Sequence, residues 1–95
     1  MINIKEIFEK YEDKYLKFEE IKNKSSNRPD LHAFILLDIL VPGKFDIVSC
    51  AAHDEFWLEV TPEQLAKVAT EKDILDLIKC GIRYDDDVES FCMFV

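Results

Sequence analysis

Glycine is scarce in this chain, whose 95 residues include only Gly43 and Gly81. A phosphate-binding loop needs several glycines within a few residues, so the sequence excludes loops of that kind. Cysteine is equally sparse. Cys50, Cys80 and Cys92 are odd in number and form no closely spaced pair, which argues against a disulfide framework and a zinc knuckle. We expect all three to be packing residues in a reducing compartment.

Long apolar runs are also missing. The longest, residues 33–37, is far too short to span a bilayer. The first residues meet charges at Lys5 and Glu6 before any apolar signal core could form. We therefore expect a cytoplasmic protein with no membrane association.

Positive charge is the third scarcity. Twelve Lys and Arg face 20 Asp and Glu, which gives a net charge of −8 and a pI near 4.6. This balance argues against direct nucleic-acid binding and favours a protein partner with a basic surface. The first 24 residues carry six bases and six acids, so the whole excess falls in residues 25–95. We expect one domain, residues 1–95, with a charge-balanced helix over 1–24 and an acidic α+β body over 25–95.

The charge-balanced segment has a regular apolar pattern. Apolar side chains recur at spacings of four and three over residues 3–23, which predicts one amphipathic helix; the stripe is Ile4, Phe8, Tyr11, Tyr15 and Phe18. We interpret the stripe as the side that packs on the body. The alternative is that part of it faces a second copy, which would make a homodimer through this helix.

The sequence of the acidic body, residues 25–95, predicts both helices and strands. We expect a largely buried helix over residues 31–41, where a strand is the alternative. Strands follow over 45–49 and 55–60, helices over 62–69 and 71–80, and a last strand over 91–95. Thr61 and Thr70 begin the two later helices as capping boxes, and Gly81 ends the second. Residues 82–84 are a candidate partner for the last strand. The order ααββααβ predicts an α+β fold, with a small antiparallel sheet of about three strands packed by helices.

Three groups of residues have side chains that could carry chemistry. His53, Glu55 and Glu59 fall on one strand face and could hold a divalent metal, but no second histidine supports such a site. Residues 85, 87 and 89 alternate as acids like the start of a calcium loop, but the required glycine is missing. Cys50 and His53 are three residues apart, and a nucleophile pair would need direct contact. We therefore expect no enzymatic activity and no cofactor; the alternative is a small metal-dependent or hydrolytic enzyme using His53 and nearby carboxylates.

The excess acid predicts an interaction surface instead. Asp54, Glu55 and Glu59, together with the turn over residues 85–89, would form an acidic patch around an aromatic anchor, Trp57. The residues that we expect to bind a partner are Trp57, Glu55, Glu59, Asp85, Asp86 and Asp87. The hypothesis is a non-enzymatic acidic module that binds a protein.

Three segments resemble small uncharacterised proteins carried by bacteriophages and prophages: residues 28–34, 53–55 and 80–85. Such proteins are often accessory factors that bind host machinery. The resemblance implies a phage-borne modulator or inhibitor of a host protein, and it brings no functional residues with it. Mimicry of nucleic acid by the acidic body stays open.

Overall fold

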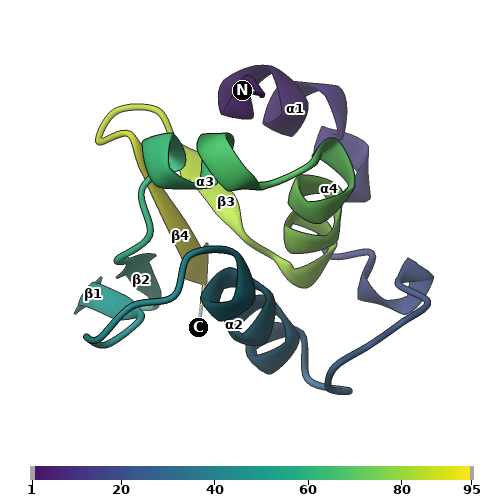
Figure 1. The fold of residues 1–95 in the computed structure, drawn as a ribbon, viewed down its shortest axis with the longest axis horizontal. Helices are drawn as coiled ribbons and strands as arrows, with labels where there is room; N and C mark the ends of the chain where they lie inside the picture. Colours follow the sequence, from purple (N-terminus) through teal and green to yellow (C-terminus); the bar gives the residue numbers. More distant parts are fainter. Residues whose placement is uncertain (1, 95) are drawn as a thin grey trace.

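The computed structural model describes residues 2–94, and within them four α-helices accompany a four-stranded antiparallel sheet (Figure 1). The helices are α1 (Ile4–Lys10), α2 (Pro29–Leu40), α3 (Pro62–Val68) and α4 (Glu71–Cys80). The strands are β1 (Val48–Ala52), β2 (Glu55–Leu58), β3 (Arg83–Asp85) and β4 (Ser90–Phe94), and they lie side by side in the order β1-β2-β4-β3.

The α+β class is confirmed, and the strand count is corrected. The order within the described residues is ααββααββ, because residues 83–85 form a fourth strand that pairs with β4. The predicted last strand, residues 91–95, is β4, although Val95 lies outside the described residues. A turn of four residues joins β3 to β4, and β3 is the edge strand on the side of the sheet away from β1.

The single helix predicted over residues 3–23 is wrong beyond Lys10. After α1 the chain continues in two short 3₁₀ turns, Glu12–Lys14 and Phe18–Glu20. A straight helix over 3–23 would be about 31 Å long, which exceeds the longest dimension of the molecule, 29 Å. The chain bends instead at Leu16, whose φ of 65° is left-handed and whose N–H donates to the carbonyl of Ile78 at 3.3 Å. That bond joins the bend to the last turn of α4, where the carbonyl of Ile78 also accepts the N–H of Gly81 at 3.0 Å.

The aromatic stripe packs on the body, as the preferred interpretation expected. Phe8 lies 5.8 Å from the ring of Phe91 and 6.0 Å from that of Tyr84, measured between ring centroids. Phe18 packs edge-on against the imidazole of His32. Because the chain bends, the stripe contacts different elements along its length instead of forming one continuous face.

The first hairpin is shifted from its predicted place. The first strand was expected over residues 45–49 and occupies Val48–Ala52. Its turn is only His53 and Asp54, with His53 at a left-handed φ of 58°, so pairing continues to Ala52 opposite Glu55. Residues 45–47 line a pocket beside the end of α2.

The helix starts at Thr61 and Thr70 are confirmed. Thr61 Oγ1 accepts the N–H of Gln64 at 3.1 Å, and the Gln64 side chain accepts the Thr61 N–H at 3.0 Å. Thr70 and Asp73 repeat this exchange at 3.2 and 2.9 Å. Gly81 follows α4 with φ 104°, a left-handed value that glycine adopts without strain.

Each capping threonine is expected to contribute to stability. Replacing Thr61 or Thr70 with alanine should lower the free energy of unfolding by about 0.5–2 kcal/mol, since one N–H in the first turn loses its acceptor. Urea titration of each variant measures the change. Replacement of the exposed Thr61 or Thr70 by serine, which keeps the hydroxyl, is the control and should cost less.

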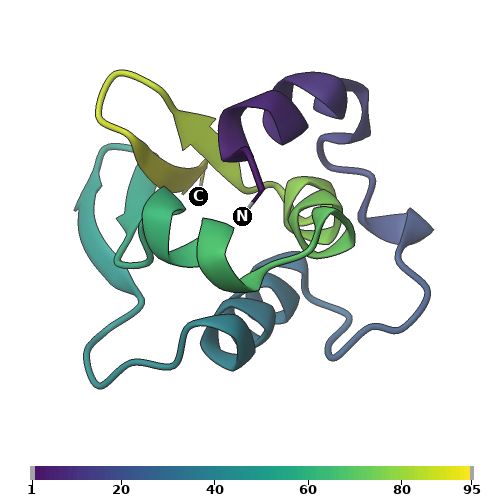
Figure 2. The same ribbon diagram turned by 45° about the horizontal axis from the view of Figure 1, so that its top comes forward.

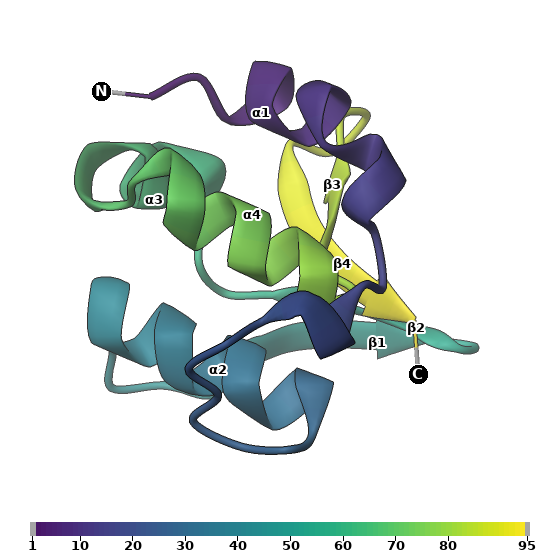
Figure 3. The same cartoon turned by 90° about the vertical axis from the view of Figure 1, so that its right-hand side faces the viewer.

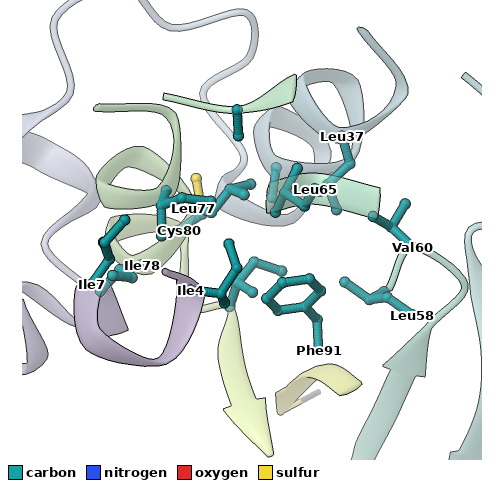
Figure 4. Packing of buried hydrophobic residues seen from close by; sticks show 14 of the residues in the cluster. Ile4, Ile7, Leu37, Leu58, Val60, Leu65, Leu77, Ile78, Cys80 and Phe91 are labelled. Carbon is teal, nitrogen blue, oxygen red and sulfur yellow. The ribbon is translucent and has the colours of Figure 1, made fainter. Parts of the chain in front are cut away.

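The helices cover one face of the sheet. Figures 2 and 3 show α2, α3 and α4 as a layer on one side, with α1 above α4 and beside β3. The core lies between these layers, where Phe91 of β4 belongs to one buried cluster with side chains from α1, α2, α3 and α4 (Figure 4). Phe91, Leu65, Ile74 and Leu77 have no exposed surface. Trp57 and its neighbours therefore lie on a face that these helices do not cover.

Candidate interaction surface on the outer sheet face

The strand register defines which side chains share the uncovered face. Cys50, Trp57, Cys92 and Arg83 stand opposite one another across the four strands. Side chains alternate along a strand, so residues two apart from these join the same face. We call this the outer sheet face; its members are Cys50, Ala52, Glu55, Trp57, Arg83, Asp85, Ser90, Cys92 and Phe94. Phe56, Leu58 and Phe91 point to the core, as the alternation predicted for β2.

Trp57 occupies the middle of this face. It is half-buried and lines a shallow hollow of about 300 Å³ with Ser49, Cys50, Val88 and Ser90. Its indole Nε1 is buried and has no hydrogen-bond acceptor among residues 2–94. The hollow therefore has an accessible apolar surface. It also contains an unsatisfied N–H donor, which an acceptor on a partner would satisfy if the face rearranges on binding.

Glu55 is engaged within the chain. Arg83 Nη1 donates to Glu55 Oε1 at 3.0 Å, and the guanidinium carbon lies 4.4 Å from the centroid of the Phe94 ring. Because β4 separates β3 from β2, this pair crosses over Cys92, which has no exposed surface. The predicted acidic contact at Glu55 is thus balanced by a neighbouring base.

The remaining acids gather at one end of the face. β2 runs antiparallel to β4, so Glu59, just after β2, lies at the same end as the turn between β3 and β4. Asp85 Oδ1 accepts the N–H of Asp87 at 3.1 Å, and Asp87 is exposed. We call Glu59, Asp85, Asp87 and Glu89 the acidic end; none of the four forms a salt bridge within residues 2–94.

Two predicted members of the patch lie differently. Asp86 forms a salt bridge with Lys5 of α1 at 3.1 Å, which raises the pKa of Lys5. Asp54, in the turn between β1 and β2, lies at the opposite end of the sheet, because that turn is beside the end of β4 and not its start. Glu59, Asp85 and Asp87 therefore lie at one end of the sheet and Asp54 at the other, with Trp57 between them; Glu59 also lines the pocket beside the end of α2.

Val88 is the surface residue that the sequence analysis missed. It is 60% exposed and borders the hollow at Trp57. The available signal was one branched apolar residue inside an otherwise acidic turn. In an isolated turn such a residue has no packing role, which is a reason to look for a surface beside it.

The structure does not bring together the side chains that could form a metal site or a nucleophile pair. Among residues 2–94, no three His, Cys, Asp or Glu side chains lie close enough to hold a metal ion. His53 and Cys50 are both exposed, and the structure contains no hydrogen bond between them. The carboxylates near His53 therefore form no ready-made ligand set around it.

The cysteines differ from one another, which corrects the expectation that all three are packed inside. Cys80 and Cys92 are buried, whereas Cys50 is exposed on β1. Burial, with a smaller effect of Asp76, raises the pKa of the Cys80 thiol to about 12. Burial and the Glu55 carboxylate raise the pKa of Cys92 to about 12, although the Arg83 guanidinium opposes this shift. Neither buried thiol is therefore available as a thiolate near neutral pH.

Thiol labelling tests this assignment. At pH 7 a maleimide reagent should modify Cys50 rapidly in the native protein, and Cys80 and Cys92 only after unfolding. Mass analysis of the labelled peptides identifies each site. Rapid native labelling of Cys80 or Cys92 would contradict the packing that the structure gives them.

Comparisons with protein-family models, curated proteins and solved structures found no match to this chain. Within residues 2–94, no helix has both the length and the apolar character needed to cross a bilayer.

Proposed function

We propose that this chain is a non-enzymatic module that binds a protein partner through its outer sheet face. The observation that carries the proposal is the bare face itself: helices cover the inner face, while the opposite one presents Trp57 beside the acidic end. A half-buried tryptophan in a shallow hollow is typical of an interface anchor, because a large rigid ring is desolvated at little entropic cost.

The charge distribution supports a basic partner. Glu55 and Asp86 are paired within the chain, but Glu59, Asp85, Asp87 and Glu89 are not, so their field extends into solvent. Such a field attracts a positively charged surface over about one Debye length, ~8 Å at physiological salt. The acidic end would therefore speed the encounter with the partner and orient it.

Trp57 supplies the short-range contact in this proposal. An arginine or lysine that enters the hollow could place its cation over the indole and its aliphatic stem against Val88. The nearby carboxylates would then pair with neighbouring bases on the partner. A basic surface carrying one such protruding side chain fits both the hollow and the acidic end.

The resemblance to phage-borne accessory proteins suggests where such binding would act. In this setting the module would modulate or inhibit a host protein by occupying its basic surface. No reaction is needed for that effect, since a bound module excludes whatever the surface would otherwise contact.

The experiment is a kinetic measurement with the protein that co-purifies from the native host. Glu59→Gln, Asp87→Asn and Glu89→Gln together remove three charges from the acidic end while keeping polar side chains. We expect the association rate to fall about threefold or more at low salt, and the difference from wild type to shrink as salt rises. Asp85 is left intact because it accepts the Asp87 N–H.

The matched control removes the same charge elsewhere. Three substitutions of exposed acids on the helical side remove the same three negative charges there: Glu6→Gln, Glu19→Gln and Glu63→Gln. This control should reduce the association rate less than the acidic-end variant does. Equal rates for the two variants would mean that net charge alone governs encounter, and the acidic end would lose its role.

A further inference from the structure

Helix α2 carries an apolar stripe that the other elements within residues 2–94 leave largely exposed. Between Asp30 and Asp38 its only polar residue is His32, which is buried. Leu31, Ile35 and Ile39 are four residues apart and so share one face of the helix. Leu31 is 45% exposed and Ile39 69% exposed, while Ile35 between them is half-buried.

The buried side of α2 explains why this stripe faces solvent. Ala33 and Leu37 point into the core, and the Phe34 ring packs edge-on against Phe56 of the sheet. A core-facing helix usually has charged residues on its opposite side. Here the opposite side carries Leu31, Ile35 and Ile39 beside Asp38, and this aliphatic share is typical of a helix that packs on a second surface.

The charges at the ends of the stripe are self-complementary. Arg28 is the N-cap residue, with extended backbone just before α2, and Asp38 lies three residues after Ile35 near the other end of the helix; both are exposed. Neither forms a salt bridge within residues 2–94. Arg28 and Asp38 are each five residues from residue 33, and Leu31 and Ile35 are each two residues from it. One midpoint therefore relates both pairs.

We propose that α2 is the interface of a homodimer, in which two copies pack their α2 helices antiparallel about a two-fold axis at the level of residue 33. Leu31 of each copy then faces Ile35 of the other, and Arg28 of each copy faces Asp38 of the other. A two-fold interface requires a surface that complements itself in this way.

The dimer would have a consequence for binding. α2 lies in the helical layer, so its exposed side and the outer sheet face are different surfaces (Figure 3). Two outer sheet faces stay free in the dimer, which makes it a bivalent module. One helix pair buries less than the ~800 Å² per partner of a standard interface, so the dimer should be reversible.

Sedimentation over a wide concentration range tests the interface. Wild type should shift from monomer to dimer as concentration rises, and Ile35→Glu should weaken the dimer roughly tenfold or more, because a carboxylate is buried without a partner. Val68→Glu, which changes an exposed aliphatic residue of α3, is the control and should leave the dimer unchanged. A wild type that is monomeric throughout, or a dimer indifferent to Ile35→Glu, would overturn the proposal.

A charge exchange tests the antiparallel arrangement. Arg28→Glu and Asp38→Arg should each weaken the dimer several-fold, since each places like charges together, and the double variant should restore it. Each change also places a charge favourably at its end of the helix dipole, so loss of folding is not expected. A double variant that is weaker than either single variant would overturn the two-fold arrangement.

Discussion

Replacing Phe91 with alanine is expected to lower the free energy of unfolding by about 3–5 kcal/mol. Phe91 has no exposed surface, and its ring packs at 5.8 Å from Phe8 and 6.2 Å from Tyr84. The ring joins β4 to α1 and the helical layer, so its removal leaves a cavity between elements that cannot easily close. Of the substitutions considered, this one should cost the most stability.

Urea or thermal unfolding measures the effect, with Phe45→Ala as the matched control. Phe45 is 85% exposed in the loop after α2, so the same chemical change there should be nearly neutral. A Phe91→Ala variant as stable as Phe45→Ala would mean that the centre of the core lies elsewhere. Partial collapse of the site would place the cost at the lower end of the range.

Replacing Trp57 with alanine is expected to weaken binding of the partner by about 2 kcal/mol or more, or roughly thirtyfold in Kd. The indole is the largest apolar group on the outer sheet face, and it lines the hollow with Cys50 and Val88. Its loss removes a short-range contact and leaves the acidic end intact. The dissociation rate should therefore rise, while the association rate should change little.

Phe45→Ala again serves as the control, since it removes an exposed ring that does not line the hollow at Trp57. Circular dichroism and unfolding of both variants separate lost binding from lost folding. A Trp57→Ala variant that is folded and dissociates at the wild-type rate would contradict the role of this residue. A variant whose association rate falls while its dissociation rate stays the same would mean that Trp57 acts in the first encounter with the partner and does not hold the complex together.

The parts of the fold that were predicted correctly depend on local chemistry. A capping box uses residues three apart, and a left-handed glycine ends the helix next to it, so Thr61, Thr70 and Gly81 could be interpreted without knowing the fold. Alternation along β2 likewise separated Trp57 from Phe56 and Leu58. In each case the interacting residues lie within one helical turn or one strand repeat of each other in the sequence.

The parts that were missed depend on contacts between distant residues. The periodicity over residues 3–23 fits a helix, but α1 ends at Lys10, and the N–H of Leu16 donates to the carbonyl of Ile78, 62 residues further along. The pairing of Glu55 with Arg83 is equally non-local, at 28 residues. Sequence could supply the acids and the tryptophan of the candidate surface, but not which acids are already paired.

The sequence contains a signal for the stripe of α2, but that signal indicates a helix buried within its own chain. An apolar run over residues 31–41 predicted a largely buried helix, and α2 does form there, over Pro29–Leu40. Composition cannot distinguish a helix covered by its own chain from one covered by a second copy. That distinction required the positions of Leu31 and Ile39 on the folded surface.

The most direct test of the outer sheet face uses the single tryptophan of the chain. In a proton–nitrogen NMR spectrum the indole N–H of Trp57 gives one resolved signal, and titration with the partner reports contact at that point. We expect this signal to shift together with the amides of β2, β4 and the turn over residues 86–89, while the amides of α3 change little. An unshifted Trp57 indole, with the changes concentrated on the helical layer, would contradict the assignment of the outer sheet face as the binding surface.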